Sequence, residues 1–189
     1  MPTTIFHKSG GYEQLLSFRK ATIIYDGTVR FTDRYLRRGD RTVDQMIQAA
    51  RSGKQNIAEG NLAAATSTET EIKLTNVARA SLGELLIDYQ DYARLHNIPI
   101  WERNHPLKQR LIDLNRDRNA NYDTFRRAIE HEQTEIVVNT MVFLIEMAMY
   151  LLDRNLQTME RNFLQQGGIR ERMSTARREY RDNRRDKGQ

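Results

Sequence analysis

The chain lacks cysteine and is poor in proline. None of its 189 residues is a cysteine, which excludes disulfides, thiolate nucleophiles and cysteine-type zinc sites and favours a reducing compartment. Its three prolines are Pro2, Pro99 and Pro106. Because proline lacks an amide N–H and clashes with the preceding helical turn, it is expelled from helix interiors. The long proline-free stretches on either side of residues 99–106 therefore predict an all-α protein.

Hydrophobic residues are also scarce, at 39% of the chain against 29% for charged residues. This balance suits amphipathic helices with narrow apolar stripes. The most apolar segment, residues 141–152, is interrupted by Glu146 and is shorter than the roughly 20 residues that cross a bilayer. The N-terminus lacks the basic-then-apolar pattern of a signal peptide. We therefore expect a cytoplasmic protein with no membrane partner.

Apolar residues recur at three- and four-residue spacing, which predicts an antiparallel up-and-down four-helix bundle. The clearest stripe is Leu74, Ala78, Leu82, Leu85, Tyr89 and Tyr92. Gly60 is expected to end the second helix. Thr42 with Gln45, and Thr68 with Glu71, have the spacing of a capping box. The expected helices are about 12–37, 42–59, 68–96 and 133–165.

Two further segments complete the predicted organisation. Residues 97–131 are expected to form an irregular connection, apart from a short helix near 107–114, inserted into a bundle domain of residues 1–168. Within it, Ile98, Ile100 and Trp101 form an exposed-looking apolar segment. Residues 169–189 are predicted to form a basic amphipathic extension with a narrow apolar stripe of Ile169, Met173, Ala176 and Tyr180.

Positive charge is concentrated in this extension. Residues 169–189 hold eight Lys and Arg against four Asp and Glu, whereas the remaining residues hold 22 against 21. Localised basic charge favours phosphate-bearing partners, although solvated helices and tails packed on a neighbouring subunit have the same composition. The candidate nucleic-acid-binding residues are Arg170, Arg172, Arg177, Arg178, Arg181, Arg184 and Arg185, with Arg51 and Lys54 as weaker candidates on the second helix.

These features predict a non-enzymatic protein that binds RNA or DNA through clustered arginines, and the resemblance described below implies that it is a homo-oligomer. The alternative is a structural or adaptor oligomer that recognises a partner protein through the tail's apolar stripe or the Ile98–Trp101 segment. A di-iron site in a helical bundle needs two Glu-x-x-His pairs. The sequence has one, Glu102 with His105, so it does not predict such a site. Phosphate-loop and dinucleotide fingerprints are absent. Glu84, Asp88 and Asp91 are read as a solvated helix flank, so no catalytic residue, metal or cofactor is predicted.

One stretch carries a family resemblance. Ala49-Ala50-Arg51-Ser52, then Asn56-Ile57-Ala58-Glu59-Gly60, and later Ala80-Ser81-Leu82-Gly83-Glu84-Leu85, resemble the small bacterial four-helix-bundle family encoded in intervening sequences of 23S ribosomal RNA genes. The resemblance covers roughly residues 15–96 and, more loosely, 134–165. Asn56, Ile57, Ala58, Glu59 and Gly60 are interpreted as structural residues that pack and end the second helix.

The resemblance implies antiparallel bundles that assemble as homopentamers. A relative of this family, the accessory protein of diversity-generating retroelements, forms a basic barrel that binds nucleic acid and a reverse transcriptase. Two departures stand out. Ser52-Gly53-Lys54-Gln55 replaces the Ser-Ile-Pro that is common in the family, and the extra residues 97–131 and 169–189 resemble the variant with a C-terminal suffix.

Overall fold

The computed structural model describes residues 11–37 and 39–186, and for residues 166, 169, 170, 172 and 183–186 it describes the backbone alone. Within these residues the chain is helical and contains no strand, so the predicted all-α class is confirmed. The elements, in chain order, are η1 (Tyr12–Gln14), α1 (Leu16–Tyr35), α2 (Arg41–Ala63), α3 (Thr68–Leu95), α4 (Pro106–Asn115), α5 (Tyr122–Ile129), α6 (Thr134–Gln166) and α7 (Ile169–Asp186).

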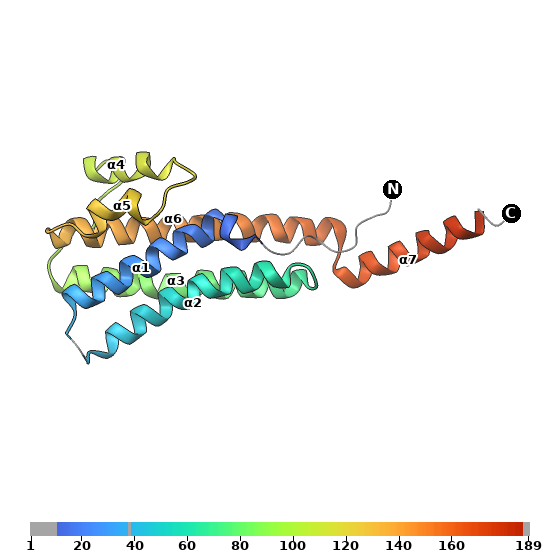
Figure 1. The fold of residues 1–189 in the computed structure, drawn as a ribbon, viewed down its shortest axis with the longest axis horizontal. Helices are drawn as coiled ribbons and strands as arrows, with labels where there is room; N and C mark the ends of the chain where they lie inside the picture. The colour runs from blue at the N-terminus through green and yellow to red at the C-terminus, as the bar shows by residue number, and fades with distance from the viewer. Residues whose placement is uncertain (1–10, 38, 187–189) are drawn as a thin grey trace.

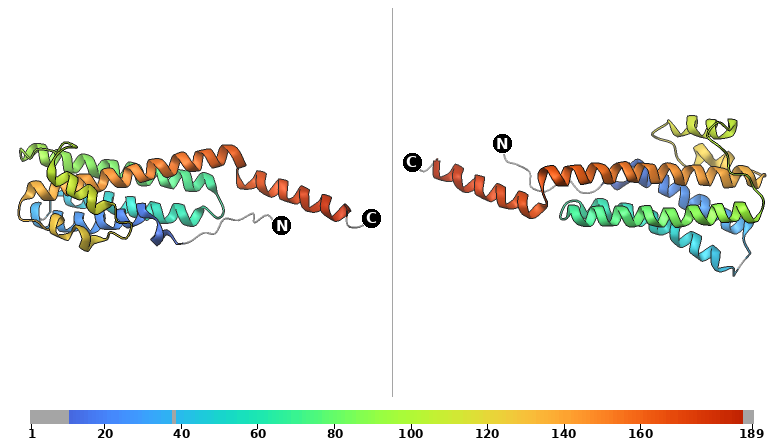
Figure 2. Two further views of the ribbon diagram at one scale, coloured as in Figure 1. Left: turned by 90° about the horizontal axis from the view of Figure 1, so that it is seen from above. Right: turned by 180° about the vertical axis from the view of Figure 1, so that it is seen from behind.

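The four longest helices of the body lie side by side, and each contacts two of the others. α1 packs on α2 and α6, and α3 also packs on α2 and α6. α1 and α3 run in one direction and α2 and α6 in the other (Figure 1). The two short helices α4 and α5 cover α6 near its N-terminal end, whereas α7 leads away from its C-terminal end, as two further views confirm (Figure 2).

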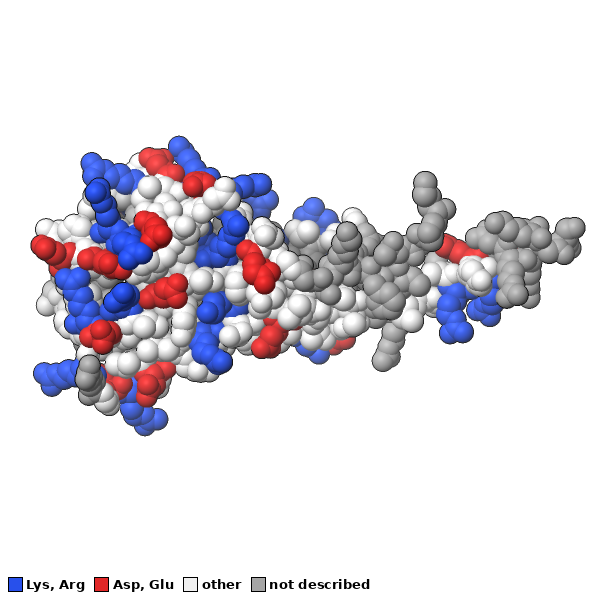
Figure 3. Space-filling view, viewed as in Figure 1, with Lys and Arg blue, Asp and Glu red and all other residues white. Residues whose placement is uncertain are grey.

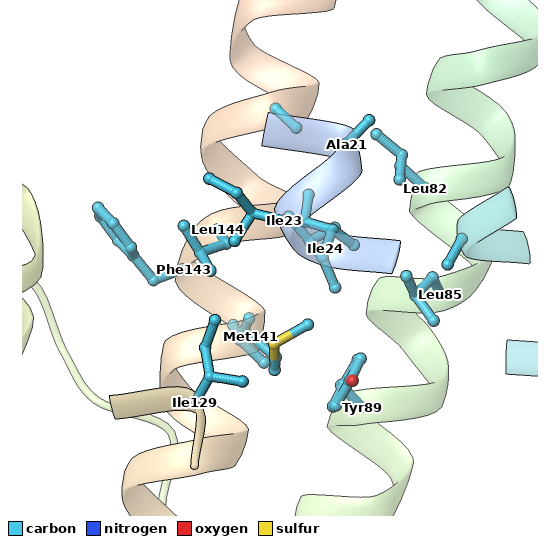
Figure 4. Close-up of a cluster of buried hydrophobic side chains, with 14 of the residues drawn as sticks. Ala21, Ile23, Ile24, Leu82, Leu85, Tyr89, Ile129, Met141, Phe143 and Leu144 are labelled. Carbon is cyan, nitrogen blue, oxygen red and sulfur yellow. The ribbon is translucent and has the colours of Figure 1, made fainter. Parts of the chain in front are cut away.

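The core lies where these helices face one another. Ile24 of α1, Leu82, Leu85 and Tyr89 of α3 and Met141 of α6 are fully buried, and Figure 4 shows them converging between the helices. They occupy one stripe on each helix, as three- and four-residue spacing requires. The predicted α3 stripe is largely right. Its ends, Leu74 and Tyr92, are half-buried.

The caps of α2 and α3 lie slightly before the predicted ones. The N-cap of α2 is Asp40, whose carboxylate accepts the Thr42 N–H at 2.9 Å. The N-cap of α3 is Ser67, whose hydroxyl accepts the Thr70 N–H at 3.1 Å. Asp and Ser satisfy orphan amides at a helix start, so the predicted boxes beginning at Thr42 and Thr68 are wrong by one or two residues.

Gly60 does not end α2, contrary to the prediction. The helix continues to Ala63, and Gly60 is buried against α3, where an added Cβ would lie 3.4 Å from the Leu74 Cβ. A Cβ on Gly53 would lie 2.8 Å from the Leu82 Cδ2. Both glycines let α2 approach α3 closely, which explains why a residue that commonly stops helices stands inside this one.

The connection between α3 and α6 is more ordered than predicted. It contains α4, which has Pro106 in its first turn, and α5, which opens with a capping box between Asn121 and Thr124. Phe125 and Leu111 are buried. α4 lies close to the short helix predicted near 107–114. α5 was not predicted: short helices are stabilised mainly by packing, and its two buried residues are too few to show periodicity in the sequence.

Among the described helices, α6 alone is long and apolar enough to cross a membrane by composition. The apolar segment 141–152 belongs to this helix, whose bounds lie within one residue of the predicted 133–165. Of its most apolar window, 61% is buried inside the structure, against α1, α3, α4 and α5. Core helices of soluble proteins pass the same test of length and composition.

Candidate nucleic-acid interface

The predicted basic extension begins with a sharp change of direction. Gly167, at φ +69°, closes α6 through its N–H bond to the Phe163 carbonyl at 2.9 Å. The Gly168 N–H then donates to the Glu171 carboxylate at 2.6 Å. Such a carboxylate bond satisfies an orphan amide at a helix start. The sequence therefore both stops α6 and starts α7 within three residues.

α7 makes no extensive contact with another described helix. Arg177, Arg178 and Arg181 are exposed, as are Met173 and Tyr180 of its apolar stripe. Arg170, Arg172, Arg184 and Arg185 belong to α7, but their side chains lie outside the described part of the chain. The described portion of the predicted patch is therefore solvent-facing along its length.

Charge is separated around α7. At about 100° per residue, Arg177 and Arg181 lie about 40° apart, whereas Glu171, Glu179 and Asp182 all lie more than about 110° from Arg177. Arg178 lies about 100° from Arg177, on the side of the carboxylates. Figure 3 shows blue and red side chains on opposite edges of this helix. On the visible face of the body the two colours are interspersed instead. The basic edge of α7 is thus free of carboxylates among its described residues.

The two weaker candidates stand elsewhere. Arg51 and Lys54 lie on α2, which makes no extensive contact with α7. Arg51 is exposed, but Lys54 is half-buried with its Nζ 4.2 Å from the centre of the Tyr25 ring. This cation–π contact fixes the ammonium against α1. The structure does not bring these two residues into one surface with the arginines of α7.

The family-like motif lies on the same part of α2. The Asn56 Nδ2 donates to the Ser52 carbonyl at 2.9 Å, so this amide bonds within its own helix. Ile57, Ala58 and Gly60 are buried, whereas Glu59 is exposed. The motif is therefore largely a packing surface toward the core, and Glu59 faces solvent in the single chain.

The sequence reading missed an acidic groove between α2 and α3. It has a volume of about 620 Å³. The Ser52 and Ser81 hydroxyls lie 2.9 Å apart across it. Asp88 is half-buried there, and burial, aided by the charges of Asp91 and Glu84, raises the pKa of its carboxyl. The lining residues are Asp44, Gln45, Gln48, Ala49, Ser52, Ser81, Glu84 and Asp88.

No sequence signal identifies this groove, because its carboxylates come from two helices that only packing brings together. The interpretation of Glu84, Asp88 and Asp91 as a uniformly solvated flank is wrong for Asp88, which turns toward α2. Glu84 and Asp91 are exposed. The described residues include no group of three or more His, Asp or Glu placed to hold a metal ion.

The prediction that Ile98, Ile100 and Trp101 form an exposed segment is wrong for Trp101. Trp101 is buried, with its ring 4.4 Å from the His105 ring in a stacked contact. Its indole N–H donates to the Glu135 carboxylate at 2.7 Å. A large aromatic ring with a satisfied N–H is a typical anchor, so this segment docks on α6. Ile98 is half-buried, and Ile100 is exposed.

Comparisons with protein-family models, with curated proteins and with solved structures found no match for this chain. The resemblance to the ribosomal-RNA intervening-sequence family therefore stays a prediction.

Proposed function

We propose that the chain is a non-enzymatic, oligomeric binding protein that contacts the phosphates of RNA or DNA through α7. The observation that carries this proposal is the charge separation on a helix whose described arginines are exposed. Arginine pairs two phosphate oxygens with its planar guanidinium. A row of arginines one helical turn apart, with the carboxylates on the other side, suits a polyanion.

Assembly would strengthen this contact. Under the proposal, α1, α2, α3 and α6 form an antiparallel up-and-down bundle that associates with further copies, as a pentamer if the family resemblance holds. Each copy then supplies one α7, and several linked contacts give an overall affinity well above that of one. The nearly neutral body adds little to this attraction.

The expected binding depends steeply on salt and little on sequence. Each arginine–phosphate contact contributes about −0.7 to the slope of log K against log salt for single strands, and about −0.9 for B-DNA. Phosphate contacts position a protein without reading bases. We therefore expect similar affinities for unrelated sequences of equal length.

Fluorescence anisotropy with labelled single- and double-stranded RNA and DNA, across a salt series, tests the proposal. The intact chain is compared with a chain ending at Gly168 and with Arg177→Gln/Arg178→Gln/Arg181→Gln. The triple variant is expected to reduce the salt slope by about 2 to 3 for a duplex. A matched control removes the same charge from exposed arginines of the body, as Arg110→Gln/Arg127→Gln/Arg161→Gln.

Loss of binding on truncation and in the α7 variant, but not in the body variant, supports the proposal. Equal losses in both triple variants would show that net charge rather than α7 determines binding. Binding that survives truncation after Gly168 would contradict the proposal, as would no binding at low salt.

A second candidate function is recognition of a partner protein. It is favoured by the exposed apolar side chains of α7, where Met173 is 40% and Tyr180 69% exposed. An amphipathic helix without a partner in its own chain is a common docking element. Affinity capture with the intact and truncated chains checks this function, and recovery of nucleic acid alone would count against it.

A further inference from the structure

The acidic groove carries an unbalanced charge. Asp44, Glu84 and Asp88 line it, and the described residues that line it include no Lys or Arg. Burial raises the pKa of the Asp88 carboxyl, and the nearby charges of Asp91 and Glu84 raise it further, so the groove disfavours an unpaired negative charge. A cationic side chain placed in this groove would pair with that charge.

An apolar strip runs beside the groove on α3. Ile87 is 57% exposed, and Ala80, two turns earlier on the same face, is also exposed. At about 100° per residue, this strip lies about 70° around α3 from the line through Glu84 and Asp88. The outer surface of α3 therefore presents two adjacent stripes, one acidic on the side of α2 and one apolar.

α7 presents the complementary pair of stripes. Its Arg177 and Arg181 are separated from the stripe of Met173, Ala176 and Tyr180 by about 85°, in the same rotational sense as on α3. Arg177 and Arg181 are four residues apart, as are Glu84 and Asp88. Both the angular offset and the axial spacing therefore match, with basic residues where α3 has acidic ones.

The order of the stripes fixes the orientation of such a contact. On both helices the charged stripe lies on the same rotational side of the apolar stripe. When two such helices face each other, the acidic stripe meets the basic stripe and the apolar stripes meet each other only if the helices run antiparallel. α3 and α6 already run in opposite directions (Figure 1). A reversal at Gly167–Gly168 would bring α7 of the same chain back parallel to α3, with its arginines over the apolar strip. The matched contact therefore requires a second copy.

We propose that α7 of one copy docks antiparallel on α3 of a second copy. Arg181 enters the acidic groove beside Glu84 and Arg177 beside Asp88, and this register places Tyr180 of the apolar stripe over Ile87. This also gives α7 the packing partner that a helix of its length lacks in the single chain. The proposal does not depend on nucleic-acid binding, but both use Arg177 and Arg181, so a bound polyanion competes with this contact.

Disulfide trapping tests the contact without background, because the chain has no cysteine. Chains carrying Ile87→Cys are mixed with chains carrying Tyr180→Cys and mildly oxidised, and the product is measured on a non-reducing gel. The expected result is a cross-linked species of twice the chain's mass. The pair Met173→Cys and Ala80→Cys is the orientation control, because these positions meet only if α7 lies parallel to α3.

Charge reversal then tests the groove. Adding Glu84→Arg/Asp88→Arg to the Ile87→Cys chain is expected to lower the yield by about fivefold or more, because like charges then meet. Adding Arg177→Glu/Arg181→Glu to the Tyr180→Cys chain should restore it. Circular dichroism on each variant checks that it is folded, and Arg110→Glu/Arg161→Glu on the body is the matched control that should restore nothing.

Several results would overturn the proposal. They are no cross-link in the mixture, a yield that charge reversal leaves unchanged, a preference for the Met173→Cys and Ala80→Cys pair, or a cross-link only within single chains that carry both Ile87→Cys and Tyr180→Cys. Anisotropy on the same groove variant separates the two proposals. A trapped dimer without nucleic-acid binding contradicts only the proposed function, and nucleic-acid binding without a trapped dimer contradicts only this contact.

Discussion

Two segments outside the four long helices, residues 97–131 and α7, both carry many arginines but differ in how they pack. Both contain one amphipathic stripe or more. The first packs closely on α6, whereas α7 contacts no described helix extensively. Figure 1 shows α4 and α5 covering α6 while α7 leads away from it.

The difference lies in a few buried anchors. The Trp101 backbone N–H donates to the Asn139 Oδ1 at 2.7 Å, and the Asn139 Nδ2 donates to the Pro99 carbonyl at 2.9 Å. Phe125 of α5 is completely buried. Among its described side chains α7 exposes Met173 and Tyr180, and it makes no extensive contact with another described helix. Residues 97–131 hold 12 charged residues among 35, whereas α7 holds 11 among 18. The segment that docks therefore has both more apolar anchors and a smaller share of charge.

The largest expected effect concerns the buried anchor of α5. Phe125→Ala should lower the free energy of unfolding by about 3–4 kcal/mol, because it removes a fully buried ring and leaves a cavity. Tyr180→Ala on α7 is the matched aromatic control and should change it by less than about 0.5 kcal/mol. Urea unfolding followed by circular dichroism measures both. Comparable losses in the two variants would mean that α7 is as firmly packed as α5.

Asn139→Leu should lower the free energy of unfolding by about 2–3 kcal/mol. It leaves the buried backbone N–H of Trp101 without an acceptor and the Pro99 carbonyl without its donor. Asn162→Leu, at an exposed position on the same helix, is the control. Trp101 fluorescence reports whether the segment has left α6. An unshifted emission spectrum together with unchanged stability would show that this bonding does not hold the connection in place.

Lys20→Met should stabilise the protein by about 2 kcal/mol at pH 7. Lys20 is 5% exposed, and its Nζ has no hydrogen-bond partner among the described residues and lies 4.8 Å from the centre of the Phe125 ring. Burial lowers the pKa of this amine from 10.5 to about 8, partly offset by Asp117. The charged form is thus disfavoured by folding.

The lowered pKa of the Lys20 amine also determines how the effect of Lys20→Met on stability depends on pH. Between pH 8 and 10.5 the unfolded lysine binds more protons than the folded one, so its contribution makes stability rise with pH across this window. The difference in unfolding free energy between Lys20→Met and the original chain should therefore shrink as pH rises from 8. Tyrosine titrations are common to both chains and cancel. A constant difference would show that the Lys20 amine titrates normally in the folded state.

The smallest effect is expected for the tail. Ending the chain at Gly168 should change the unfolding free energy by less than about 0.5 kcal/mol in dilute protein, where contacts between copies do not contribute. The same truncation at high protein concentration should lower the melting temperature if α7 docks on a second copy. No change at either concentration would indicate a tail that stabilises neither the chain nor an assembly.

Much of the helical structure follows from local rules. Proline depletion and apolar spacing predicted the all-α class and placed four long helices within a few residues of α1, α2, α3 and α6. The exceptions have local causes. Leu15, whose backbone is extended, separates η1 from α1, which shortens the predicted helix 12–37. Arg177, Arg178 and Arg181 were placed on one helix by their spacing alone, and α7 carries them there.

Other features arise only from contacts between residues far apart in the chain. Glycine commonly stops a helix, but Gly60 lies inside α2 because α3 packs against it. Trp101 looks exposed beside two prolines, yet Glu135 and Asn139 bury and bond it. The acidic groove needs Asp44 and Asp88 from two helices, and no local pattern joins them.

The sequence by itself determined the class, the long helices and the position of the charge-rich tail, because helix periodicity and capping act over a few residues. The tertiary structure decided which appendage is packed, which carboxylates face one another and which lysine loses its water. Those outcomes depend on burial and on the partners that packing supplies.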